Sequence, residues 1–239
     1  MLIDGLADAA EQLLDTQLDE NQLRSFEVYL EELLAWNTHT NLTAITEPEE
    51  VITRHFLDSL TCLSAIGKVD DSLRLADIGT GAGFPGLPLK IACPRLDLTL
   101  VDATGKKVEF LEHLTARLNL TGVTCLQLRA EDMGQMPAYR ESFDWVVGRA
   151  VAHLRVLAEY LLPLCRVGGH CLAQKGEGAE IEAEDAQQAF TTLGGTLERI
   201  LPVKLPGLSS PHHLVVIRKI AATPAKYPRR AGMPTKRPL

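Results

Sequence analysis

Apolar and polar residues alternate over the first 66 positions with the spacing of amphipathic α-helices. One helix is predicted around residues 23–34, where apolar side chains recur at i, i+3 and i+7. A second is predicted from about Glu47 to about Ile66, because Thr46–Glu49 has the pattern of a capping box with a proline in the first turn. The polar residues 37–43 between them predict a loop. The apolar positions of the first helix are Leu23, Phe26, Leu30, Leu33 and Leu34.

From residue 73 onward, short apolar segments alternate with amphipathic stretches. This alternation predicts an α/β fold, a mostly parallel sheet with helices on both faces. Two further strands near the end of the chain predict an antiparallel hairpin at the sheet edge, which makes seven strands in all. The predicted strands are Leu73–Ile78, Leu98–Val101, Val123–Leu128, Phe143–Val147, His170–Ala173, Thr196–Lys204 and His213–Lys219, and the predicted helices are Lys106–Leu118, His153–Leu164 and Ala179–Leu193.

The pattern divides the chain into three segments. Residues 1–66 form a helical segment that we expect to pack on the core, residues 67–220 form the α/β domain, and residues 221–239 form a basic, proline-rich tail. The length of 239 residues, of which 46% are hydrophobic, fits one α/β domain with an added segment.

Features of membrane or secreted proteins are missing from the sequence. No apolar run approaches the ~20 residues that span a bilayer, and the first residues lack the basic start and apolar stretch of a signal peptide. The five cysteines form no C-x-x-C pair and no zinc-ligand spacing. We therefore expect a cytoplasmic protein with reduced cysteines and no metal site.

Charge is distributed unevenly along the chain. The net charge is −7, which argues against a polyanionic partner, and residues 1–50 hold twelve acids and one base. From Lys204 onward there are eight Lys and Arg residues and no acid. A basic end on an acidic body can contact phosphate locally, or it can simply keep the protein soluble. Arg229 and Arg230 in this tail are candidate phosphate contacts, because its four prolines favour an extended, accessible path. The alternative is that Tyr227 and the prolines pack back on the domain and the tail is structural.

A glycine-rich segment, Asp77–Gly86, follows the first predicted strand and begins a helix. Alternating glycines permit a tight turn and a close approach of a cofactor to the backbone. Gly81–Gly86 matches G-x-G-x-x-G, and Asp102 ends the next strand 21 residues after Gly81. The same pattern occurs in dinucleotide-binding proteins, so the glycines alone leave the cofactor open.

Three observations favour S-adenosylmethionine over a dinucleotide. Asp77 extends the motif to D-x-G-x-G-x-G, the form found in methyltransferases. Ala130 and Glu131 follow the third strand, where an adenine contact is expected. A dehydrogenase also needs a second domain, for which too few residues remain. Asp102 suits either cofactor, because a carboxylate there accepts hydrogen bonds from ribose hydroxyls. The predicted cofactor contacts from this reasoning are Gly79, Gly81, Asp102, Ala130 and Glu131.

The end of the fourth strand restricts the reaction. Methyltransferases of exocyclic amines often have [DN]-P-P-[YF] there, and cytosine-C5 enzymes have a nucleophilic cysteine, whereas this chain has Val147–Ala150. A nucleophile that needs no activation is favoured, such as guanine N7. It attacks without losing a proton, so no catalytic general base is expected and the rate would come from proximity and electrostatics.

These motifs together resemble the bacterial small-subunit rRNA 7-methylguanosine methyltransferases, the RsmG or GidB family. The resemblance covers nearly the whole chain and is specific because several separate motifs coincide. They are Trp36-Asn37, Asn41–Ile45, Arg54-His55 with Asp58–Leu60, Asp77–Pro88, Asp102, Lys106-Lys107, Ala130-Glu131, Ser142–Asp144, Arg149-Ala150, Lys175-Gly176, His213–Ile217 and Tyr227–Pro234.

The resemblance implies a Rossmann-like class I methyltransferase sheet preceded by N-terminal helices. It implies methyl transfer from S-adenosylmethionine to N7 of one guanine in 16S rRNA, with the small ribosomal subunit as partner. It also implies cofactor contacts at Gly79, Phe84, Ala130, Glu131 and Arg149. Many relatives have Leu where this chain has Phe84, which would make a bulkier wall to the pocket.

Three further residues are candidate substrate contacts. Arg54 and His55 belong to a family motif on a helix expected near the carboxyl edge of the sheet, although both could be ordinary helix-surface residues. Lys175, at the end of a strand, could bind a phosphate. Two other functions stay open: a methyltransferase of a small molecule or protein, which the low basicity favours, and an RNA-binding assembly factor without catalysis, which the intact glycine segment disfavours.

Overall fold

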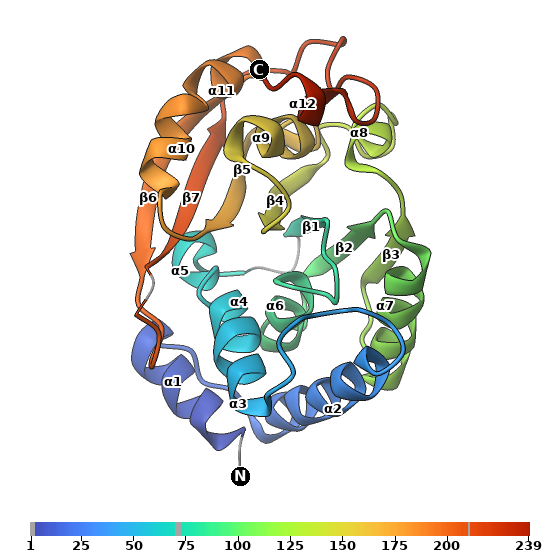
Figure 1. The fold of residues 1–239 in the computed structure, drawn as a ribbon, viewed down its shortest axis with the longest axis vertical. Helices are drawn as coiled ribbons and strands as arrows, with labels where there is room; N and C mark the ends of the chain where they lie inside the picture. Colours follow the sequence, from blue (N-terminus) through green and yellow to red (C-terminus); the bar gives the residue numbers. More distant parts are fainter. Residues whose placement is uncertain (1–2, 70–72, 210) are drawn as a thin grey trace.

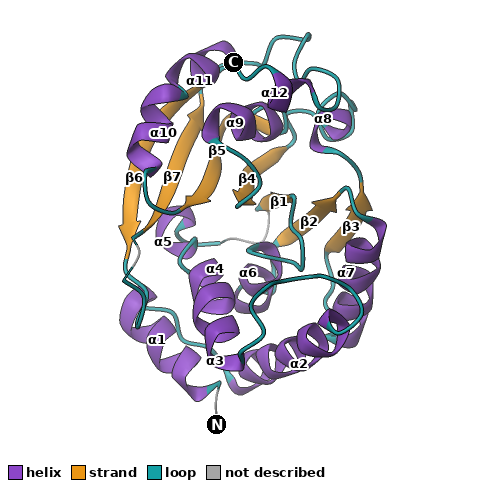
Figure 2. Cartoon of the chain, in the orientation of Figure 1, coloured by secondary structure: helices purple, strands orange, loops and turns teal. Residues whose placement is uncertain are grey.

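The computed structural model describes residues 3–69, 73–209 and 211–239. Its centre is one seven-stranded sheet in the order β3-β2-β1-β4-β5-β7-β6, with helices on both sides (Figures 1 and 2). The sheet confirms the predicted α/β architecture. Its strands are β1 (Arg74–Ile78), β2 (Asp97–Asp102), β3 (Val123–Gln127), β4 (Phe143–Arg149), β5 (Cys165–Lys175), β6 (Gly195–Val203) and β7 (His212–Lys219).

Strand direction determines which residues meet at the functional edge of the sheet. Strands β3, β2, β1, β4 and β5 are parallel, whereas β7 runs antiparallel between β5 and β6. The carboxyl ends of the five parallel strands therefore lie at one edge, and the first residues of β7 join them there. The predicted hairpin is confirmed, with its second strand on the inner side.

Helices cover the two faces of the sheet as follows. The N-terminal helices, α6 and α7 share one apolar core, and α9, α10 and α11 share the other. Successive residues of β4 show the alternation, because Trp145 and Val147 face the first core and Val146 faces the second. The helices are α1 (Asp4–Leu14), α2 (Glu20–Asn37), α3 (Pro48–Val51), the π-helix η1 (Ile52–Leu57), α4 (Asp58–Leu60), α5 (Leu63–Ile66), α6 (Gly86–Ala92), α7 (Gly105–Arg117), α8 (Ala130–Met133), α9 (Leu154–Leu161), α10 (Ala179–Asp185), α11 (Gln187–Thr192) and α12 (Met233–Lys236).

The prediction of one continuous α-helix from Glu47 to Ile66 is wrong, because the structure has several shorter helical segments there. The N-cap of the first is Glu47, without a side-chain hydrogen bond, and Pro48 takes the first helical position, where its fixed φ fits. The predicted capping box therefore does not form. The helix passes through a π-helical turn and then breaks after Leu60. Side-chain hydroxyls compete locally for main-chain carbonyls, because Thr61 Oγ1 donates to the carbonyl of Asp58 at 2.5 Å.

Two other predictions need correction. The helix predicted over Ala179–Leu193 is two helices, α10 and α11, separated at Ala186. The tail, predicted to be extended and accessible, packs beside α8 and α9 and contains the short helix α12 (Figure 1). The reason is that Tyr227, Pro228 and Pro234 are buried against the domain.

All five cysteines are free thiols. Within the described residues, no helix is long and apolar enough to cross a membrane.

Candidate active site

Two cavities lie along the edge where the parallel strands end. The first, here called the glycine-loop cavity, measures about 200 Å³ and is lined by Gly79, Asp102, Ala130, Glu131, Val151 and Tyr160, together with Gly232 and Thr235 of the tail. The second, here called the basic cavity, measures about 480 Å³ and is lined by Arg54, His55, Asp58, Arg149, Lys175 and His212, among others.

The glycine-loop cavity begins where β1 ends. Gly79 and Gly81 have φ of +67° and +62°, values that residues with a side chain rarely adopt. The Gly79 N–H donates to the carbonyl of Val101 at 2.8 Å, which fixes the turn against β2. A Cβ on Gly79 would lie 2.8 Å from Cγ2 of Val151, so the absence of a side chain is required by packing as well as by φ.

Asp102 connects the end of β2 to the glycine turn. Its carboxylate is 7% exposed; Oδ2 accepts from the Gly81 N–H at 3.1 Å and Oδ1 from the Thr104 N–H at 2.8 Å. Each carboxylate oxygen can accept more than one hydrogen bond. Asp102 is therefore held rigidly at the cavity with capacity left for the hydroxyls of a ribose.

Glu131 lies at the start of α8, after β3, and is 5% exposed. Its Oε1 accepts a hydrogen bond from the Gly232 N–H at 2.9 Å. This contact spans 101 residues and was not visible in the sequence. The tail thus reaches the same cavity as the residues predicted from the glycine motif.

Asp77 provides a test of whether this site fits S-adenosylmethionine. It is fully buried; Oδ2 accepts from Thr80 Oγ1 and from the Gly86 N–H, but Oδ1 has no hydrogen-bond partner within the described part of the chain. Burial raises the pKa of this carboxyl to about 6. Asp77 lines neither cavity, so it acts on the site through the glycine turn, while the acids Asp102 and Glu131 in the lining fit a nucleoside that carries positive charge.

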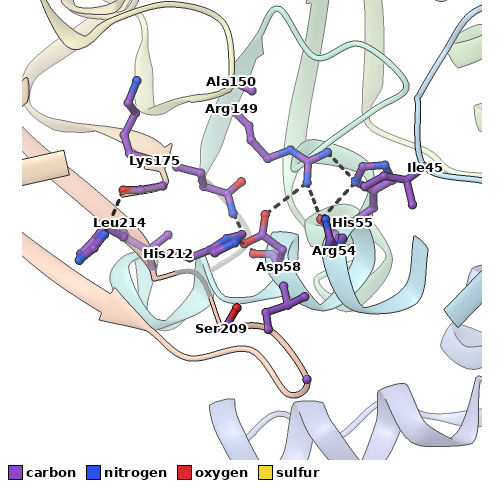
Figure 3. A pocket seen from close by; sticks show the side chains of 15 residues that line it. Ile45, Arg54, His55, Asp58, Arg149, Ala150, Lys175, Ser209, His212 and Leu214 are labelled. Carbon is purple, nitrogen blue, oxygen red and sulfur yellow. Dashed lines mark hydrogen bonds and ion pairs between the residues drawn. The ribbon is translucent and has the colours of Figure 1, made fainter. Parts of the chain in front are cut away.

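The basic cavity is organised by a buried ion pair. Arg149, the last residue of β4, places Nη1 3.2 Å from Oδ2 of Asp58, and Oδ1 of the same carboxylate lies 3.1 Å from Nδ1 of His212 (Figure 3). The guanidinium also lies over the ring of Phe84, 4.9 Å from its centroid. Arg149 is therefore fixed by two neighbours from distant parts of the chain.

His55 is held neutral in this cavity. Burial, and then the nearby charge of Arg149, lower its pKa to about 4. Nδ1 of its ring lies 3.2 Å from Nη2 of Arg149 and 3.1 Å from the main-chain carbonyl of Arg54. Nε2 lies 2.8 Å from Thr43 Oγ1, so both ring nitrogens have hydrogen-bond partners. At neutral pH His55 carries no charge, lines the cavity and stacks on the ring of Phe84.

The pKa of His212 is shifted in the opposite direction from that of His55. Its hydrogen bond to Asp58 raises its pKa, so the charged form is the one that the fold favours. Its contribution to stability is fully present below the unfolded value of about 6.5 and is lost as pH rises through the raised pKa. We expect the difference in melting temperature between wild type and His212→Gln to be largest at pH 6 and to shrink by pH 9. The effect of His55 cancels in this difference; a constant difference across that range would contradict the assignment.

The other predicted substrate residues are placed as follows. Arg54 lines the basic cavity with an exposed side chain. Lys175 also lines it, and its Nζ lies 2.7 Å from Glu182 and donates to the carbonyl of Ala152. Arg229 and Arg230 line neither cavity; Arg229 pairs with Glu159, and Arg230 is exposed.

The structure separates residues that the resemblance had grouped together. Phe84 and Arg149, both predicted as cofactor contacts, pack on each other, and Arg149 lines the basic cavity, whereas Gly79, Ala130 and Glu131 line the other one. Phe84 and Gly81 line neither cavity. Segment 149–151 connects the two cavities, because its first two residues line the basic cavity and the third lines the glycine-loop cavity.

Sequence reasoning missed several residues of the two cavities. Asp58 is within a quoted motif, and its spacing from Arg54 could have suggested that both lie on one side of a helix. His212, Tyr160 and Thr235 carried no local signal, because each reaches its cavity only through the tertiary fold.

Asp102→Ala should weaken binding of S-adenosylmethionine. Removing the carboxylate leaves ribose hydroxyls unpaired and frees the glycine turn, at a cost of about 1–3 kcal/mol, or roughly 5- to 150-fold in affinity. Calorimetric titration measures this loss. Asp102→Asn, which keeps one acceptor oxygen, should lose less, and wild-type affinity in the alanine variant would remove Asp102 from the site.

Comparison with known proteins finds consistent relatives over almost the whole chain. A family model described as GidB, rRNA small subunit methyltransferase G, matches residues 22–210. Ribosomal RNA small subunit methyltransferase G of Roseiflexus castenholzii is 51% identical over 93% of this chain and 94% of that protein. The protein of the same name from Desulforamulus reducens is 44% identical over 98% and 97%.

Solved structures confirm the predicted fold. A geranyl diphosphate methyltransferase in complex with SAM has a TM-score of 0.54 at 13% identity, covering 69% of this chain and 85% of that chain. At this identity the likeness concerns the fold alone, which is that of class I methyltransferases.

Proposed function

The chain belongs to the family of rRNA small subunit methyltransferase G, and on that premise we propose that it methylates N7 of a guanine in 16S rRNA. Membership makes it an S-adenosylmethionine-dependent methyltransferase that acts on ribosomal RNA. The finer assignment, to guanine N7 within the small subunit, rests on the resemblance to the RsmG or GidB family, and the arrangement of the two cavities supports it. We place the reaction in the cytoplasm, where ribosomal subunits are available.

The observation that carries the proposal is the wall shared by the two cavities. Arg149 and Ala150 line the basic cavity and Val151 lines the glycine-loop cavity. Ala150 has φ of +54°, an unfavourable conformation for a residue with a side chain. A methyl donor on one side of this segment and a nucleotide on the other would meet at its edge.

The residues of the glycine-loop cavity would hold the donor. S-adenosylmethionine supplies a methyl group on a positively charged sulfur. Asp102 would accept hydrogen bonds from the ribose, and Ala130 and Glu131 would contact the adenine. The glycine backbone at Gly79 and Gly81 would permit close approach.

The residues of the basic cavity would orient the target nucleotide. Guanine N7 has a lone pair and loses no proton on attack, so neutral His55 is needed only as a wall and not as a base. Arg149, fixed by Asp58, provides a rigid donor and positive charge, while Arg54 and Lys175 are placed to meet phosphates. The rate would then come from alignment and electrostatics.

An acidic body need not prevent RNA binding, because four basic side chains line this cavity, where an RNA phosphate would compete with the acids that Arg54, Arg149 and Lys175 now pair with. Arg54, Arg149, Lys175 and His212 lie along one edge of the sheet. Outside the cavity, exposed Arg230 stays a predicted phosphate contact. If Arg229 also contacts a phosphate, it must do so while it is paired with Glu159.

The proposal is tested by methylation of defined RNA. Purified protein is incubated with S-adenosylmethionine and either unmethylated 16S rRNA or 30S subunits from cells lacking the gene, and nucleosides are mapped by mass spectrometry. We expect 7-methylguanosine at one position. Methylation at another atom, or of small molecules only, would overturn the assignment.

A further inference from the structure

We propose that the C-terminal segment, residues 227–236, is part of the cofactor site, where it closes one side of the glycine-loop cavity and fixes the carboxylate of Glu131. The inference rests on the proposed function for the identity of the ligand. It concerns a different part of the chain from the glycine motif, and a role different from the phosphate contact predicted for the tail.

The first observation is direct contact with the cavity. Gly232 and Thr235 line it, and the Gly232 N–H donates to Glu131 Oε1 at 2.9 Å. Gly232 has φ of +79°, which turns the chain at the start of α12. Thr235 Oγ1 lies 3.1 Å from the hydroxyl of Tyr160, another lining residue. The tail thus holds two side chains of this cavity, one on each of two helices.

The second observation is a strong, independent anchor next to the contact. Glu159 on α9 has a fully buried side chain, and within the described part of the chain its hydrogen bonds come from Arg229: the main-chain N–H at 2.7 Å, Nε at 2.9 Å and Nη2 at 2.6 Å. This hydrogen bonding raises the pKa of Arg229. A buried carboxylate depends on such a partner, so the segment before Gly232 is fixed.

Further contacts fix the same segment from the other side. Gln135 Nε2 donates to the carbonyl of Pro228 at 2.7 Å, and Arg140 Nη1 donates to that of Tyr227 at 2.7 Å. The tail is therefore fixed at several points where it reaches the cavity, and Figure 1 shows it beside α8 and α9.

The consequence for binding follows from the carboxylate of Glu131. With Oε1 engaged by Gly232, Oε2 is held in one direction and can accept from the adenosine part of the ligand without first losing rotamer freedom. Releasing the tail should leave Glu131 mobile and the adenosine side open. Affinity for every ligand that contains adenosine should then fall by a similar factor.

The test uses the full-length chain in which both charged residues of the Arg229–Glu159 anchor are replaced by uncharged ones. The double variant Arg229→Met/Glu159→Gln leaves no buried charge, and Gln135→Leu weakens the second anchor. Arg237→Met, an exposed arginine of the same tail, is the matched control. Calorimetry gives dissociation constants for S-adenosylhomocysteine and for adenosine, and thermal unfolding checks the fold.

We expect both dissociation constants to rise about tenfold in the double variant, less in Gln135→Leu, and not at all in Arg237→Met. Combining the double variant with Glu131→Ala should give less than the product of the two separate losses, since both act through one carboxylate. A purely structural tail would instead give independent losses. Unchanged affinity in a folded double variant, or independent losses, would overturn the inference.

Failure of this inference is distinct from failure of the proposed function. If wild type binds S-adenosylhomocysteine but leaves 16S rRNA unmethylated, the substrate assignment fails while the binding data on the tail still stand. If wild type methylates rRNA and the variants bind normally, only the role of the tail is rejected.

Discussion

Gly79→Val should greatly weaken binding of S-adenosylmethionine. A Cβ at this position would lie 2.8 Å from Cγ2 of Val151, and φ of +67° is strained for any side chain. The left-handed conformation costs about 1–2 kcal/mol. The branched side chain would also displace Val151, which lines the cavity. We expect the dissociation constant to rise on the order of a hundredfold or more, equivalent to about 2.7 kcal/mol.

Matched glycine variants separate the two causes. Gly81 has a similar φ of +62°, but a Cβ there meets nothing within 4 Å. Gly81→Ala therefore reports backbone strain and any contact with the cofactor without crowding by the protein, and Gly79→Ala adds crowding against Val151. The double variant Gly79→Ala/Val151→Ala should recover affinity toward that of Gly81→Ala. Calorimetry and thermal unfolding on this set measure both effects, and near-normal binding by Gly79→Val would mean that the cofactor binds elsewhere.

The part of the site that could be predicted from the sequence is the part built by local structure. A strand, a glycine turn and an acid at the end of the next strand define their own geometry, because parallel strands place their carboxyl ends together. Gly79, Asp102 and Glu131 accordingly line one cavity. The same logic predicted the seven strands, which have strong apolar patterns.

The unpredicted part depends on contacts between distant segments. Asp58 meets Arg149 across 91 residues and His212 across 154. No periodicity encodes such a meeting, so Asp58 was indistinguishable from an ordinary helix acid. The tail was misjudged for a related reason: basic residues and prolines usually indicate an accessible segment, and nothing local showed that Glu159 would be buried opposite Arg229.

The interruption of the helix in residues 47–66 could not be predicted from the local sequence pattern either. The apolar spacing of residues 47–66 suits one continuous helix, yet the chain contains a π-helical turn there. This turn carries Arg54 and His55, and Asp58 follows it directly. The irregular backbone therefore places three residues in the lining of the basic cavity. π-Helical turns occur frequently at functional sites. The error in predicting the helix thus falls on a part of the chain that the proposed function uses.

Asp58→Ala should have the second large effect, on methylation and on stability together. Its carboxylate is 6% exposed and binds both Arg149, whose side chain is 17% exposed, and His212. Removing one member of a buried ion pair leaves an uncompensated charge, at a cost of about 3–5 kcal/mol. For a chain of this size that corresponds to a fall in melting temperature of roughly 6–20 °C. Methylation of rRNA should fall on the order of a hundredfold, because Arg149 loses the partner that holds it at the wall between the two cavities.

Two companion variants distinguish loss of stability from loss of function. Asp58→Ala/Arg149→Met removes the stranded charge and should regain much of the melting temperature, yet methylation should stay low because no cation remains at that wall. Asp58→Asn keeps the shape of the side chain and one acceptor oxygen, so it should fall between wild type and Asp58→Ala in both measurements. Single-turnover methylation of 16S rRNA, measured beside thermal unfolding, gives both quantities for each protein. If the double variant recovered methylation along with stability, the ion pair would be a structural element only, and the orientation of the guanine would have to be assigned to Arg54 or Lys175 instead.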